Sequence, residues 1–193
     1  MPTHSRVWGK AIANGDEWLK ELRTELRTDL RSELRWRSAG AALLALRSVL
    51  HALRDRLPPD EAVQLAAQLP LLIKGVYFDG WNPSATPVKA RSKGEFFALV
   101  RSRFQQRMLD SEAELVTRAV FKLLAAHVSD GEIRDVRGML PTPLAELWPV
   151  PEDSPVGRTA TPRRRGGVVP PSSAVPSPRG PARPPLNPAN RRS

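Results

Sequence analysis

The stretch 48–81, SVLHALRDRLPPDEAVQLAAQLPLLIKGVYFDGW, decides the fold because the chain contains a second version of it. A gap-free shift of 71 residues aligns Ala42–Tyr77 with Ala113–Trp148. Eight aligned positions are identical, and further pairs such as Leu50/Phe121, Ile73/Leu144 and Tyr77/Trp148 stay apolar. The identical pairs include Leu53/Leu124, Glu61/Glu132, Leu69/Leu140 and Pro70/Pro141. An internal repeat of this kind predicts that one supersecondary unit is used twice.

Each copy predicts one long helix followed by two short ones. In copy one, leucines spaced three and four residues apart predict a helix over 41–56 with a buried face. Pro59 suits the first turn of the next helix, and Pro70 ends it. We therefore expect an all-α helical bundle over 1–148, built from two copies of a helix–short helix–short helix repeat. Copy one covers about 15–77 and copy two about 94–148.

In copy two, Ser129 and Glu132 have the spacing of a capping box. The Ser129 side chain is expected to accept a hydrogen bond from the Glu132 backbone N–H. The Glu132 carboxylate is expected to accept one from the Ser129 backbone N–H. This helix-start role explains Glu132 without a metal or a catalytic function.

A four-residue repeat, ELRT-ELRT-DLRS-ELRW, precedes copy one over 21–36. On a helix it places leucines in one row that drifts around the axis by about 40° per step. The row could be the surface for a partner or for self-association, or the inner face of an outer helix of the bundle. The drift predicts that one end of the helix packs on the body while the other projects. The leucines considered as a partner surface are Leu22, Leu26 and Leu30.

The composition changes after Trp148: residues 149–193 contain 12 prolines and no aromatic residue. Such a segment cannot bury enough apolar surface to fold, so a disordered Pro/Arg-rich tail is expected. Residues 154–193 carry +8 of the net charge of +10. This charge would give the tail a salt-dependent affinity for nucleic acid. Alternatives are a solubilising tail, a Pro-rich ligand or a phosphorylated arm. The candidate contacts are Arg163, Arg164, Arg165, Arg179, Arg183, Arg191 and Arg192.

Sites for chemistry are sparse. The chain has no cysteine, which excludes disulfides and thiolate metal sites. Its three histidines do not converge by the repeat, and no nucleophile elbow or phosphate-binding loop occurs. We expect no enzyme activity, no metal and no cofactor. The aromatic residues Phe78 and Trp81 either cover the end of the bundle or line a partner groove.

Targeting signals are also sparse. No apolar run approaches the roughly 18–20 residues that cross a bilayer, and the N-terminus has no apolar signal-peptide core. We therefore expect a cytoplasmic protein without a membrane partner.

Several phrases occur in an order that resembles a known family, the bacterial domain of unknown function 2267. They are LHALRDRL (Leu50–Leu57), DEAVQLAAQLP (Asp60–Pro70), GVYFDGW (Gly75–Trp81) and GEIRDVRGMLP (Gly131–Pro141). The resemblance covers about residues 15–148 and implies an all-helical, soluble bacterial domain. The family carries no assigned catalytic residue, so none is transferred.

Two hypotheses for function follow. The first is a non-catalytic helical interaction module that binds a protein partner or a second copy of itself. The alternative is a nucleic-acid-associating protein that uses the Arg/Pro-rich tail.

Overall fold

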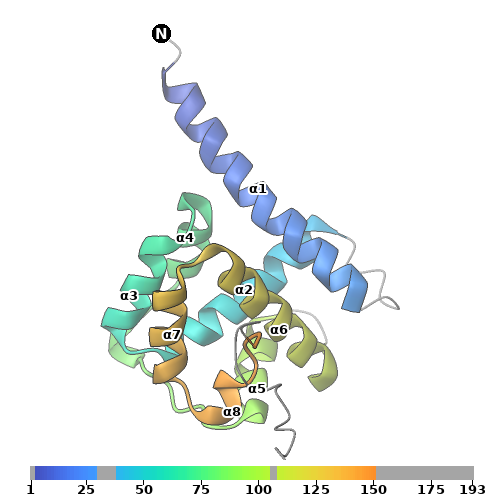
Figure 1. Ribbon diagram of the computed structural model, residues 1–193, viewed down its shortest axis with the longest axis vertical. Coiled ribbons are helices and arrows are strands. Elements are labelled where there is room, and N and C mark those ends of the chain that lie inside the picture. The colour runs from blue at the N-terminus through green and yellow to red at the C-terminus, as the bar shows by residue number, and fades with distance from the viewer. Residues whose placement is uncertain (1–2, 30–37, 105–107, 151–193) are drawn as a thin grey trace, which may run out of the picture. The chain divides into compact units, whose positions relative to one another are not determined.

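The fold is all-α, as the repeat predicted. The computed structural model describes residues 3–29, 38–104 and 108–150 (Figure 1). Within these ranges every element is a helix. The elements are α1 (Thr3–Asp29), α2 (Ala39–Arg56), α3 (Pro59–Gln68), α4 (Leu71–Phe78), the 3-10 turn η2 (Pro83–Ala85), α5 (Lys93–Arg103), α6 (Asp110–His127), α7 (Asp130–Met139) and α8 (Thr142–Ala145).

Local signals explain most helix ends. The Ser38 hydroxyl accepts from the Ala41 backbone N–H at 3.1 Å and caps α2. Pro59 occupies the first turn of α3, where its missing N–H costs nothing. Leu69 is extended because Pro70 follows it. Helices α2 and α6 are each 18 residues long, and α6, α7 and α8 begin 71 residues after α2, α3 and α4.

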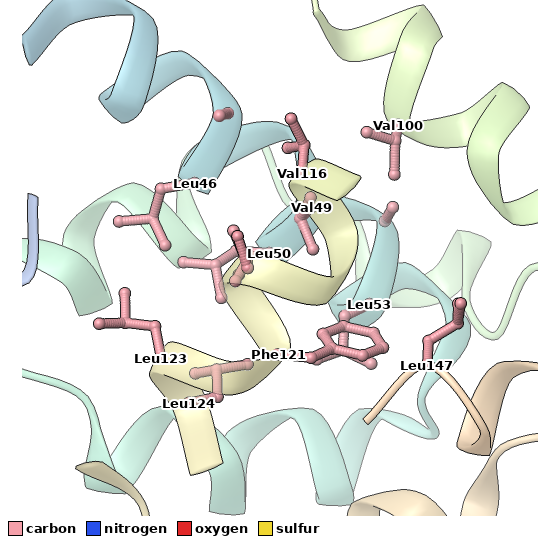
Figure 2. Close-up of a cluster of buried hydrophobic side chains, with 14 of the residues drawn as sticks. Leu46, Val49, Leu50, Leu53, Val100, Val116, Phe121, Leu123, Leu124 and Leu147 are labelled. Carbon is pink, nitrogen blue, oxygen red and sulfur yellow. The ribbon is translucent and has the colours of Figure 1, made fainter. Parts of the chain in front are cut away.

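The core lies between α2, α5 and α6, which pack against one another. Figure 2 shows side chains from these helices pointing toward a common centre, with Leu147 closing one side. Leu53 of α2 and Leu124 of α6 are both fully buried there. The buried residues labelled in Figure 2 are Leu46, Val49, Leu50, Leu53, Val100, Val116, Phe121, Leu123, Leu124 and Leu147.

Helix α1 divides into a covered and an uncovered half. It runs without a break through Asn14-Gly15-Asp16. Its second half packs on α6 and α2, where Lys122 donates to Glu25 at 2.6 Å and His127 Nε2 lies 2.7 Å from a Glu21 carboxylate oxygen. Its first half extends beyond α4 (Figure 1). The two halves thus differ in burial, but the projecting half precedes the ELRT repeat. The predicted difference within the leucine row stays a prediction, because the later leucines of the row lie outside the described residues.

The assignment of Leu22 and Leu26 to a partner surface is wrong. Their exposed fractions are 1% and 0%, because α1 uses this face to cover α6 and α2. They are core residues, as the alternative interpretation proposed. Leu30 lies outside the described residues.

The expected capping box at Ser129 is also wrong. No side-chain bond of Ser129 caps α7. Instead the Ser129 hydroxyl accepts from the Gln68 side-chain N–H at 3.1 Å, and the Ser129 backbone N–H donates to the Gln68 side-chain oxygen Oε1 at 3.2 Å. A tertiary contact with the end of α3 takes the place of the local cap.

Candidate functional site

A buried guanidinium joins α2 to the end of α4. Arg54 is only 2% exposed. Its Nη1 donates to the backbone carbonyls of Tyr77 and Asp79, the latter at 3.2 Å, and its Nε lies 2.7 Å from an Asp55 carboxylate oxygen. The last carbonyls of a helix lack partners within the helix and favour a cation. Arg54 therefore satisfies the end of α4, while Asp55 balances its charge.

Two neighbours extend this network. Asp55 also pairs with Arg103 of α5. His51 Nε2 lies 2.7 Å from the Val76 carbonyl oxygen, which can only accept, so this nitrogen carries the proton. Burial lowers the pKa of His51, which keeps the ring neutral near pH 7. These contacts connect α2 to the end of α4 and to α5.

A hollow of about 450 Å³ opens in copy two of the repeat, between α6, α7 and the chain after α8. We call it the α7 hollow. Its lining residues are Ala125, Asp130, Ile133, Arg134, Arg137, Trp148, Pro149 and Val150.

The α7 hollow corresponds to the place that Arg54 fills in copy one. A step of 71 residues takes Arg54 to Ala125, Tyr77 to Trp148 and Asp79 to Val150. All three counterparts line the hollow. Because alanine is so much smaller than arginine, the space beside the end of α8 is left open.

The charges around the two places also differ. Asp55, the acid that accompanies Arg54, is matched by Ala126. On the neighbouring short helix, Arg134 and Arg137 stand where copy one has Val63 and Ala66. Asp130 is the only acid among the described residues that line the hollow. Copy one thus encloses its own cation, whereas copy two presents two cations to an open space.

Trp148 forms the apolar floor of the hollow. Its ring stacks on Phe121 with centroids 4.3 Å apart, and the side chain is only 3% exposed. The indole Nε1–H has no hydrogen-bond partner among the described residues. A buried donor without a partner carries a free-energy cost of about 1–3 kcal/mol, which a suitable acceptor would remove.

A second cluster lies where α3 and α7 pack together. Glu61 and Glu132 each have one buried carboxylate oxygen without a hydrogen-bond partner among the described residues. The buried Tyr77 hydroxyl also has no hydrogen-bond partner there. Burial is the main cause that raises the pKa of both glutamates. The Asp135 carboxylate raises the pKa of both further, and the Glu61 carboxylate also raises that of Glu132. The pKa of Tyr77 is also raised, mainly by burial, so its hydroxyl stays protonated. Such groups oppose folding when they ionise.

Glu61→Gln is expected to raise the free energy of unfolding at pH 7.5, because the neutral amide does not carry the cost of ionising a buried carboxyl. The folded pKa of Glu61 lies above its unfolded value. The cost of ionising this carboxyl is therefore absent below the ordinary glutamate pKa and grows as the pH rises through the folded pKa. The gain should thus vanish at pH 4.

Urea unfolding at pH 7.5 and pH 4 measures this difference. Glu17→Gln, a change at an exposed position of α1, is the matched control and should show no such pH dependence. Equal effects of the two variants at both pH values would contradict the role given to Glu61.

The other sequence-predicted residues are not brought into the α7 hollow. Phe78 and Trp81 pack against the core and are half-buried, with their ring centroids 5.3 Å apart. The Arg54 guanidinium carbon lies 6.0 Å from the centre of the Trp81 ring. The seven tail arginines lie outside the described residues.

Two classes of site are not found in the described part of the chain. No helix within 3–29, 38–104 or 108–150 is both long and apolar enough to span a bilayer. Over the same residues, no group of three or more His, Asp or Glu side chains is placed to hold a metal ion.

The helices, the buried guanidinium network and the absence of strands from the described residues define an all-α helical domain. The chain belongs to the family described as an uncharacterized conserved protein, DUF2267, whose model matches residues 16–147. The resemblance drawn from the sequence phrases is thereby confirmed. A comparison with curated proteins gives no significant match.

Sequence patterns alone missed the α7 hollow and the exposed apolar residues of α1. Differences between the two copies of the repeat indicate the hollow. Ala125 of its lining is aligned with Arg54, and Arg137 is aligned with Ala66. A comparison that weighs differences between copies as well as identities could have found it. Trp8 and Ile12 precede the ELRT repeat, and only the structure shows that they are uncovered.

Proposed function

We propose that this chain is a non-catalytic helical interaction module of the bacterial cytoplasm, and that it associates with a second copy of itself through the first half of α1. The observation that carries the proposal is the length of the apolar face of α1, which exceeds the surface that covers it. The family match supports the fold and assigns no activity.

The apolar face of α1 continues beyond the body. Its covered part contains Trp18, Leu22 and Leu26, and the spacing of three to four residues continues toward the N-terminus through Gly15 and Ala11. Ile12 and Trp8 extend the same stripe, but they are 52% and 58% exposed. An apolar stripe that is buried at one end and bare at the other marks a surface for association.

Helix α4 enlarges this surface. A Cβ atom added to Gly15 would lie 3.4 Å from Leu72 Cδ1, so α1 and α4 touch at this point. Leu71 is 55% exposed and Leu72 is 40% exposed. We call Trp8, Ile12, Leu71 and Leu72 the α1–α4 face.

The charges of α1 favour a second copy in antiparallel orientation. Arg6 and Lys10 precede Gly15, whereas Asp16 and Glu17 follow it. An antiparallel pair places the basic turns of one helix beside the acidic turn of the other, and a parallel pair would place like charges together. Charges that flank an apolar seam set the orientation of paired helices in this way. A two-fold axis would use the same face on both copies.

Ile12→Glu is expected to convert a dimer of the full chain to a monomer, because it places an unpaired charge in the apolar seam. Light scattering at high micromolar protein concentration measures the change. Leu109→Glu is the matched control, since Leu109 is 57% exposed and lies at the start of α6. A wild-type chain that stays monomeric at this concentration would overturn the proposal.

Nucleic-acid association through the tail stays a prediction from sequence. It concerns residues outside the described ranges and makes no use of the α1–α4 face.

A further inference from the structure

We propose that the α7 hollow binds a small carboxylic acid with an apolar body, its carboxylate held by Arg134 and Arg137. This site lies on α6, α7 and the chain after α8, and it does not depend on self-association through α1.

The charge of the ligand follows from the comparison of the two copies. In copy one the space encloses a cation, which Asp55 and two backbone carbonyls stabilise. In copy two the counterparts of Arg54 and Asp55 are both alanine. Copy two therefore has neither a guanidinium at this place nor the carboxylate that would pair with a guanidinium. A cationic ligand would find Asp130 alone against Arg134 and Arg137, so an anion is favoured.

A carboxylate suits these two arginines. A guanidinium presents a planar fork of N–H donors that matches two carboxylate oxygens, and such charge-assisted pairs are stronger than neutral hydrogen bonds. Arg134 is exposed and Arg137 is half-buried, so both side chains can adjust to a ligand at the rim. Arg134 Nε is 3.3 Å from the Asp130 carbonyl oxygen, which anchors that side chain beside the hollow.

The rest of the lining selects an apolar body. Ala125, Ile133 and Trp148 contribute aliphatic or aromatic surface, and ligand pockets of roughly 300–1,000 Å³ are typically lined in this way. The volume of about 450 Å³ falls within that range. The indole N–H of Trp148 is itself buried and has no hydrogen-bond partner among the described residues.

The test uses octanoate as the anionic probe and the full chain labelled with ¹⁵N. The indole N–H signal of Trp148, assigned with Trp148→Phe, reports on the hollow. We expect octanoate to shift this signal in a saturable manner. Octylamine and octanol, which share the chain but not the charge, should bind at least about tenfold more weakly, because each lacks the charge-assisted bonds.

Two variants connect binding to the hollow. The double variant Arg134→Gln/Arg137→Gln should weaken octanoate binding about tenfold or more, whereas Arg91→Gln, at an exposed position before α5, should leave it unchanged. Ala125→Arg/Ala126→Asp installs the pair found in copy one and should abolish binding by filling the space. If that variant does not fold, the surface arginine variants still decide the outcome.

Three results would overturn the proposal. They are the absence of saturable binding of octanoate up to millimolar concentration, equal binding of octanoate and octylamine, and octanoate binding that is unaffected by loss of both arginines. The outcome of the octanoate test does not affect the light-scattering result expected for Ile12→Glu, so the two proposals are tested independently.

Discussion

Leu53→Ala and Leu124→Ala are each expected to lower the free energy of unfolding by about 2–5 kcal/mol, the range for buried leucines. Both side chains are 0% exposed and point into the cluster of Figure 2. The loss combines the transfer free energy of the removed atoms with the cavity that remains, because α2, α5 and α6 surround the site and relax only in part.

Chemical denaturation followed by circular dichroism measures both variants. Leu43→Ala is the matched control: Leu43 lies on the same helix as Leu53 but is partly exposed, so its loss should cost well under 2 kcal/mol. Small effects at both buried leucines would contradict the equivalence of α2 and α6 in the core.

Arg54→Leu is expected to destabilise the domain by about 3–5 kcal/mol, the range for removing one partner of a buried ion pair. The substitution leaves the Tyr77 and Asp79 carbonyls without their donor and removes one partner of Asp55. A leucine side chain fills part of the space but supplies no hydrogen bond, so the desolvation cost of these groups is uncompensated.

Arg47→Gln provides the control for this prediction. Arg47 also pairs with Asp79, at 2.6 Å, but both side chains are substantially exposed. Exposed ion pairs contribute about 0–1 kcal/mol, so the loss should be much smaller than for Arg54→Leu. Similar losses for the two variants would show that burial of the Arg54 guanidinium is not what makes it important.

The sequence predicted the features that local chemistry determines. Pro70 ends α3 wherever the helix packs, because it restricts Leu69, and Pro59 favours a helix start by its own geometry. The leucine spacing before Leu57 identifies most of the buried face of α2, because three- and four-residue steps share one side of a helix. Leu43, the first leucine of the series, is the exception and is 38% exposed. These features need no knowledge of neighbouring elements.

Features that depend on a second element were predicted less well. Ser129 has the sequence of a cap, but Gln68 from α3 bonds to both its hydroxyl and its backbone N–H. The sequence of α1 is compatible with buried or exposed side chains at Leu22 and Leu26. They are buried because α6 and α2 pack against this face of α1. The α7 hollow is likewise a property of packing, since it arises from a side chain that Ala125 does not have.

The division of α1 into two halves affects the thermodynamics of association. The second half is held by its contacts with α6 and α2, whereas the first half touches α4 at Gly15 and leaves Trp8 and Ile12 exposed. Isolated helices shorter than about 12–15 residues are marginal in water. A partner that binds the first half would therefore also supply free energy that stabilises its helical conformation. Coupling between folding and binding of this kind lowers the affinity for a given contact area and makes the complex readily reversible.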